Sequence, residues 1–196
     1  MSDQRAGKVT PSPATVRTRE GLRASAAAHV AGPEAKPALL VVWLTGTAAL
    51  ILFAGLAWYL APLEPSVVAL QFAFTPRSFA AIVHAWPAEH LLRYRSHLPV
   101  DFLLLGCYGA FGYLITSRSA LFARYSPAVR TAATWTLPLA AAFDAAENTL
   151  HLWLTAAPRF GVALPYAISG TCSTFKWALL TGFGIAVVHA LARAER

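Results

Sequence analysis

The feature of this sequence that most constrains its fold is a set of four apolar runs, each long enough to cross a lipid bilayer as an α-helix. The runs cover residues 38–60, 98–117, 132–154 and 164–191. About 20 residues at 1.5 Å per residue span a hydrocarbon layer of about 30 Å. The chain is also 57% hydrophobic and only 13% charged, whereas soluble domains carry about 25% charged residues. We therefore expect an all-α membrane protein, a bundle of four transmembrane helices.

The segments outside these runs define the rest of the expected organisation. Residues 1–37 are rich in Ala, Pro, Ser and Thr, carry more basic than acidic residues and show no hydrophobic period. This composition is typical of a disordered basic tail, and the acidic residues in it disfavour the alternative of a transit peptide. Residues 38–191 then form the transmembrane domain, whose first loop, residues 61–97, is long enough to hold helices of its own.

The first loop contains the pattern of a short amphipathic helix. Thr75 can cap a helix whose first residue is Pro76. An apolar stripe with helical spacing follows: Phe79, Ile82, Val83 and Trp86. The pattern predicts a helix that lies in the membrane interface or caps the bundle, and a second short helix is expected from residue 88 toward Pro99.

The distribution of arginines predicts the orientation. Arg118, Arg124 and Arg130 crowd the second loop without an acidic residue, while the third loop holds Arg159 alone. Basic residues near membrane spans favour the cytoplasmic side. We therefore expect a multi-pass protein of the cell membrane with both termini in the cytoplasm and residues 61–97 outside.

The third apolar run carries a stripe of polar residues. Asp144, Glu147, Asn148 and His151 occupy positions i, i+3, i+4 and i+7, so all four lie on one helical face. Such a face cannot lie against lipid at low free-energy cost. The stripe should therefore point into the bundle, in its outer half.

Polar residues of two other runs should meet this stripe. Lys176 lies at a similar depth in the fourth run, with Ser173 on the same face nearly one turn above it. Asp101 lies near the outer end of the second run, and Tyr108 follows two turns deeper on the same side. Three helices are thus expected to direct polar groups into one volume.

The formal charges in this volume do not balance. Three carboxyl groups, those of Asp101, Asp144 and Glu147, face the single cation of Lys176. Compensation could come from protonation of a carboxyl group, a charged His151, a bound cation, or outer arginines that reach inward; the candidates are Arg93 and Arg95. We expect at least one of Asp144 and Glu147 to hold a proton near neutral pH.

Intramembrane ionisable residues of this kind are candidates for function. The candidate catalytic residues are Asp144, Glu147, Lys176, Asp101 and His151, and the candidate ligand contacts are Asn148, Tyr108 and Ser173. The first hypothesis is binding or acid/base processing of a lipid-like small molecule, with membrane lipids as the surroundings. The alternatives are proton or ion translocation, a non-catalytic membrane assembly subunit, which includes a homo-oligomer, and a purely structural role as a contact between helices.

Several other function classes have no support. The net charge of +7 would suggest nucleic-acid binding in a soluble protein, but here the basic residues lie in tails and short loops. The sequence lacks the GxGxxG, P-loop, GxSxG and HExxH motifs, so no cofactor is expected. Two cysteines form no disulfide framework. A metal on Asp144, Glu147 and His151 is stereochemically feasible, but no second helix supplies a histidine, and we expect none.

Four stretches also carry a family resemblance. They are Leu70-Gln71-Phe72-Ala73-Phe74-Thr75 followed by Trp86, Asp101-Phe102, Phe143-Asp144-Ala145-Ala146-Glu147-Asn148, and Lys176-Trp177. In this order they resemble a widespread group of small four-helix bacterial integral membrane proteins without an assigned activity. The resemblance covers about residues 38–190. It implies that the polar residues act as a set and implies no substrate; the set is Asp101, Asp144, Glu147, Asn148 and Lys176.

Overall fold

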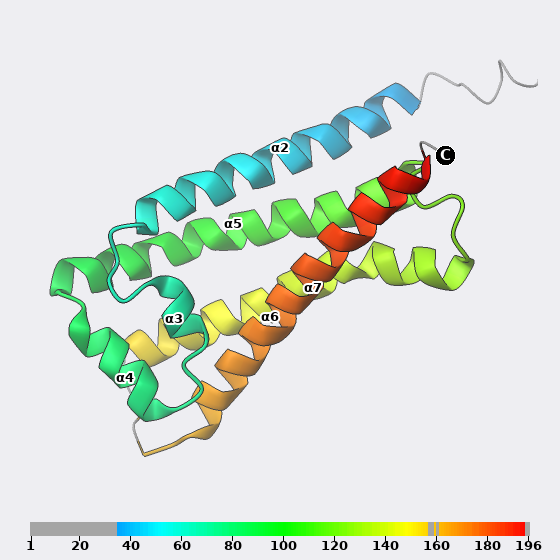
Figure 1. Cartoon of the computed structure of the whole chain (residues 1–196). Helices are drawn as coiled ribbons and strands as arrows, with labels where there is room; N and C mark the ends of the chain where they lie inside the picture. Colours follow the sequence, from blue (N-terminus) through cyan, green and yellow to red (C-terminus); the bar gives the residue numbers. More distant parts are fainter. Residues whose placement is uncertain (1–34, 157–158, 160, 195–196) are drawn as a thin grey trace, which may run out of the picture. The chain divides into compact units, whose positions relative to one another are not determined.

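The computed structural model describes residues 35–156, 159 and 161–194, and its regular structure is entirely helical there. The helices are α2 (Ala35–Leu60), α3 (Val67–Gln71), α4 (Pro76–Ala85), α5 (Ala88–Arg118), α6 (Pro127–Ala156) and α7 (Leu164–Ala194) (Figure 1). The expected all-α fold is confirmed for these residues. The chain divides into the units 1–38 and 39–196, and the account below concerns the second. Most of the predicted tail, residues 1–34, lies outside the described residues.

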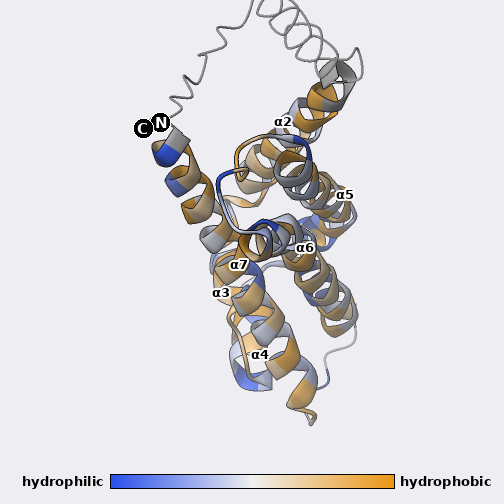
Figure 2. Ribbon diagram, turned by 90° about the vertical axis from the view of Figure 1, so that its right-hand side faces the viewer, coloured by the Kyte–Doolittle hydropathy of each residue, from blue (hydrophilic) through white to orange (hydrophobic). Residues whose placement is uncertain are grey.

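Three of the helices are long and apolar enough to cross a membrane, within the part of the chain that the structure describes. They are α2 from Leu39 to Leu60, α5, and α7 from Leu164 to Arg193. Figure 2 shows apolar residues along much of α2 and α7. The fourth predicted span, α6, does not meet the same criterion of length and hydropathy, because its polar stripe lowers its hydropathy.

Helix α5 begins ten residues earlier than the predicted run at Leu98, since it is continuous from Ala88 through Pro99. A proline inside a helix removes one backbone hydrogen bond and costs about 3 kcal/mol. Packing offsets this cost, because Tyr94, His97 and Leu98 are buried in the same stripe as the later residues of α5. The separate short helix expected for residues 88–99 is therefore the first part of α5.

Helix α4 covers one end of the bundle. Thr75 caps it, and its hydroxyl oxygen accepts a hydrogen bond from the Ser78 backbone N–H at 3.1 Å. The predicted apolar stripe faces inward. Its members pack in a core cluster that includes Leu63, Leu70, Phe79, Val83, Trp86, Tyr94, Leu98, Leu154 and Tyr166. This cluster separates the polar residues of the bundle from the surroundings on that side.

Helix α6 packs closely against both α5 and α7 in the middle of the bundle. Gly112 of α5 lies so close to α6 that a Cβ added there would lie 2.4 Å from the Leu137 Cβ. A second core cluster fills this region, with Leu104, Leu105, Leu137, Ala140 and Phe183 among its members. By contrast, only 6% of the apolar window of α2 is buried. The charged site described next therefore lies in the three-helix group.

Candidate functional site

The polar stripe of α6 is buried, as its periodicity predicts. It continues the packing stripe that begins with the buried residues Ala133, Leu137 and Ala140. Relative exposure is 5% for Asp144, 0% for Glu147, 3% for Asn148 and 1% for His151. Burying polar groups is costly unless they are paired, so their partners decide what the site can do.

Lys176 of α7 joins the two acidic residues of the stripe. Its Nζ lies 2.9 Å from Asp144 Oδ1 and 2.8 Å from Glu147 Oε2. Lys176 is itself only 3% exposed. The structure thus brings together the three residues that were predicted to overlap in depth. Because the ions are desolvated, loss of one partner would leave a buried charge without compensation.

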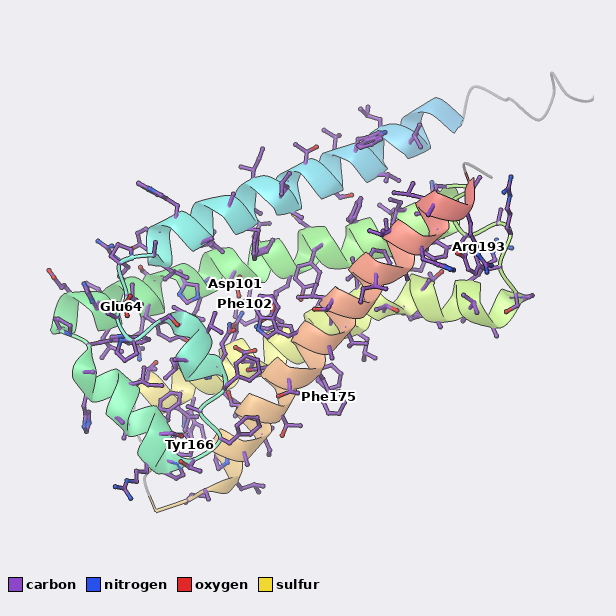
Figure 3. The ribbon with its side chains drawn as sticks, viewed as in Figure 1. Glu64, Asp101, Phe102, Tyr166, Phe175 and Arg193 are labelled. Carbon is purple, nitrogen blue, oxygen red and sulfur yellow. The ribbon has the colours of Figure 1, made fainter. Side chains whose placement is uncertain are left out.

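Helix α5 supplies two further members of the cluster. The Tyr108 hydroxyl donates to Asp144 Oδ2 at 3.2 Å. Asn148 Nδ2 donates to Asp101 Oδ2 at 2.7 Å. Asp101 therefore binds the amide of the α6 stripe and forms no ion pair with Lys176 within 4 Å in the described residues. Figure 3 shows Asp101 on α5.

His151 occupies the end of the stripe nearest α4. Its Nδ1 lies 2.6 Å from the Tyr94 hydroxyl oxygen and 3.9 Å from Glu147 Oε1. Its Nε2 and the hydroxyl oxygen of Ser169 are buried without a hydrogen-bond partner among the described residues. The ring also lies against Phe79, with the ring centroids 5.6 Å apart. His151 is therefore held in an apolar and aromatic enclosure.

The sequence prediction missed Tyr94, and one of the four candidate sources of charge compensation, the outer arginines, does not reach the carboxyl groups. Tyr94 lies seven residues before Asp101, on the same helical face, but Pro99 was taken as a break between them. The outer arginines do not compensate the carboxyl groups: Arg95 donates to the Thr155 hydroxyl at 3.1 Å, and the guanidinium of Arg93 lies over the Tyr59 ring. Long side chains at helix ends reach such polar and aromatic partners readily.

Ser173 is fully buried beside the cluster, but its hydroxyl donates to the Ser169 carbonyl oxygen at 3.1 Å. It thus satisfies its own helix, as serine commonly does within apolar helices. A direct ligand contact by Ser173 remains a prediction. Within the described residues, no group of three or more His, Cys, Asp or Glu side chains is arranged to hold a metal ion.

A cavity of about 680 Å³ adjoins the cluster. Its walls come from α2, from the segment around α3, and from α5, α6 and α7. The titratable side chains that line it are Glu64, His97, Asp101, Tyr108, Asp144 and Lys176. Glu147 and His151 are not among the lining residues. The cavity therefore contacts one side of the ion-pair cluster, that of Asp144 and Lys176.

The rest of the cavity wall is apolar. The side chains that line it along α2 and the facing helices include Ala49, Leu50, Phe53, Leu56, Leu104, Phe111, Leu137 and Leu180. Two of these residues, Leu50 and Phe53, are more than half exposed. A space of this volume with apolar walls and a few polar groups at one end is typical of a site for a small molecule.

Comparisons of the chain with protein-family models, with curated proteins and with solved structures found no match. The function must therefore be argued from the site itself.

Proposed function

We propose that this protein is a four-span membrane protein that binds a lipid-like, single-chain amphiphile in the cavity between α2 and the group of α5, α6 and α7. The observation that carries the proposal is the polarity of the cavity wall. Asp101, Asp144 and Lys176 contribute to one part of it, and aliphatic and aromatic side chains of α2 contribute to the rest. An amphiphile has the same division between a polar head and an apolar chain.

The proposal includes α6 as the fourth span. Its polar residues are buried against α5 and α7, and large apolar side chains, those of Trp135 and Leu139, are exposed on other faces. A span can carry ionisable residues when they face the interior of the bundle. In this arrangement α4 covers the outer end with its inward apolar stripe, and both termini lie in the cytoplasm, as the arginines predict.

Acid/base processing of the bound molecule is the catalytic form of this proposal. Asp144 lines the cavity and also contacts Lys176 and Tyr108. A proton on one of the two carboxyl groups at Lys176 would supply a general acid beside the ligand head, and Lys176 would stabilise negative charge there. On the other side of Lys176, three residues that do not line the cavity follow one another. Glu147 contacts Lys176, His151 lies near Glu147, and Tyr94 contacts His151.

Proton or ion translocation receives less support. A series of contacts between polar side chains runs through the cluster, from Tyr94 at one end to Tyr108 at the other. Beyond Tyr108, the core of the bundle includes apolar residues such as Leu137 and Phe183. A relay needs groups that hold and release protons along its whole length. Ligand binding in the cavity does not require such a path.

A photocrosslinking experiment tests the binding proposal. Tetradecyl chains that carry a diazirine and end in an amine, an alcohol or a carboxylate are added to the protein in lipid nanodiscs. At least one of them should label peptides of the cavity wall saturably. Ala49→Trp fills the cavity at a buried lining position and should abolish the labelling.

The matched control is Ala54→Trp, the same change on the exposed face of α2, at a position that does not line the cavity. The probes should label this variant as strongly as they label the wild-type protein. Labelling that does not saturate, or that Ala49→Trp leaves unchanged while the variant stays folded, would contradict the binding proposal.

A further inference from the structure

Hydrogen-bond donors and acceptors are unequally available at the polar end of the cavity. The donors that carry charge or belong to aromatic side chains are already engaged there. Lys176 binds Asp144 and Glu147. Tyr108 donates to Asp144, and Trp177 Nε1 donates to Gln71 Oε1 at 3.0 Å. Lys176 uses two of its three N–H donors for these carboxyl groups, and its ammonium group lies over the Trp177 ring, 5.6 Å from the ring centroid. The other donors, such as the Gln71 amide, carry no charge and suit any polar head group.

The carboxyl groups of the same region, by contrast, can still accept hydrogen bonds. Asp101 uses one carboxyl oxygen for Asn148 and has no cationic partner within 4 Å among the described residues. Glu64, which lies in the segment that links α2 and α3 (Figure 3), likewise has no ion-pair partner there. An anionic or hydrogen-bond-accepting head group would leave these oxygens unsatisfied.

His97 adds a third acceptor. Its Nδ1 contacts the Tyr94 carbonyl oxygen, which can only accept, so Nδ1 carries the hydrogen. In a neutral imidazole, Nε2 is then the acceptor, and His97 lines the cavity. The lining residues and Glu147 together carry four carboxyl groups and the single cation of Lys176. The formal charge here stays negative even when two of the carboxyl groups hold a proton.

From this inventory we infer that the cavity is selective for a long-chain amine, whose ammonium group binds Asp101 while its alkyl chain lies along α2 and Glu64 adds negative charge to the same cavity wall. An ammonium group offers three donors and a positive charge, and a carboxylate supplies the matching acceptor and charge. The inference rests on the proposed function and specifies its ligand class. Because Asp101 is partly buried among apolar side chains, this charge match should outweigh the hydrogen bonds of an uncharged head group.

Competition between chain-matched ligands tests the inference. Dodecylamine, dodecanol and dodecanoate compete with the diazirine probes for labelling of the wild-type protein in nanodiscs, and partitioning into empty nanodiscs is measured for each ligand as a correction. Dodecylamine should displace the probe at a concentration at least about tenfold lower than either rival, because charge-assisted hydrogen bonds are about twice as strong as those between uncharged groups.

The variant Asp101→Asn should remove most of this preference and leave dodecanol unaffected, because Asn can still accept from Asn148. The matched control is Glu89→Gln on the same helix, whose carboxylate is 83% exposed and does not line the cavity. If Asp101→Asn does not fold, Glu64→Gln serves the same purpose at an exposed position.

The outcomes separate the two proposals. A preference for the amine that Asp101→Asn or Glu64→Gln abolishes supports the inference. A preference that survives both changes, or equal or better displacement by dodecanol or dodecanoate, overturns the inference and leaves binding in the cavity in place. Absence of saturable labelling by all three probes overturns the proposed function, and the inference with it.

Discussion

Helices α5, α6 and α7 differ from α2 in how they are held. The first three share a core that includes Gly112 against Leu137, and they enclose the ion pairs of Lys176. Helix α2 is as apolar as a membrane span and joins this core through Ala49 and Leu56, but little of the rest of it is buried, and part of its inner face borders the cavity. The difference teaches that apolar helices of one chain can have two tasks: burial on several sides holds the charges, and burial of a narrow face alone leaves space beside them.

The largest effect should follow from removing the cation of the packed region. Lys176→Met leaves Asp144 and Glu147 without their shared partner and should lower the free energy of unfolding by about 3–5 kcal/mol. The measurement is thermal or denaturant unfolding in detergent. Adding Glu147→Gln to Lys176→Met should recover part of the loss, because one buried charge is removed with its partner.

The control is Arg193→Met, which removes an exposed cation at the end of α7 that lies over the Tyr125 ring and should cost no more than about 1 kcal/mol. Figure 3 shows Arg193 at that end. Strictly additive losses in the double variant would mean that Lys176 and Glu147 are not coupled.

The next effect tests the close packing itself. Gly112→Ala places a methyl group against the Cβ of Leu137, which cannot rotate away, so the two helices must shift. Overpacking of this kind costs about 1–3 kcal/mol. Gly106→Ala on the same helix meets nothing within 4 Å and should be neutral or stabilising by up to about 1 kcal/mol. Equal unfolding curves for the two variants would contradict the described contact between α5 and α6.

A smaller effect should follow at the His151 end of the cluster. Tyr94→Phe removes the hydroxyl that contacts His151 Nδ1 and leaves this buried nitrogen without a partner. The expected loss of stability is about 1–2 kcal/mol. Tyr59→Phe removes an exposed hydrogen bond to Ser96 and should change stability by less than about 0.5 kcal/mol. If Tyr94→Phe destabilised the protein no more than Tyr59→Phe does, the contact between Tyr94 and His151 would be contradicted.

The smallest effect on stability is expected in α2. Phe53 lines the cavity and is 53% exposed, so Phe53→Ala should cost less than about 1 kcal/mol and still weaken labelling by the diazirine probes. Leu105→Ala in the packed core should cost several times more. If Phe53→Ala destabilised the protein as much as Leu105→Ala does, the contrast between the two regions would be wrong.

Helical periodicity and depth were enough to predict that Asp144, Glu147 and Lys176 meet, but not that Tyr94 contacts His151. The spacing of Asp144, Glu147 and His151 fixes their common face, and the count of residues from the helix end places Lys176 beside them. The spacing of residues and their distance from a helix end are both properties of a single helix, and a sequence pattern predicts such properties well. The predicted roles of these residues in catalysis or binding stay predictions.

What the sequence did not predict depends on packing between helices. Pro99 suggested a break because its local cost is visible in the sequence, whereas the burial of Tyr94 that offsets this cost is not. The cavity escaped prediction for the same reason: the apolar pattern of α2 is that of a membrane span whether the helix packs closely or loosely.

The most direct test of the central claim, that a ligand binds between α2 and the group of α5, α6 and α7, is a pair of distance measurements by double electron–electron resonance. Spin labels at Trp58→Cys and Leu103→Cys report the separation of α2 and α5, and labels at Leu103→Cys and Ile168→Cys report that of α5 and α7; all three positions are exposed. Cys107 and Cys172 are first replaced by serine. Dodecylamine should narrow or shift the α2–α5 distribution and leave the α5–α7 distribution unchanged. An α2–α5 distribution that no ligand of the chain-matched series alters, in a protein that binds the ligand, would contradict the account.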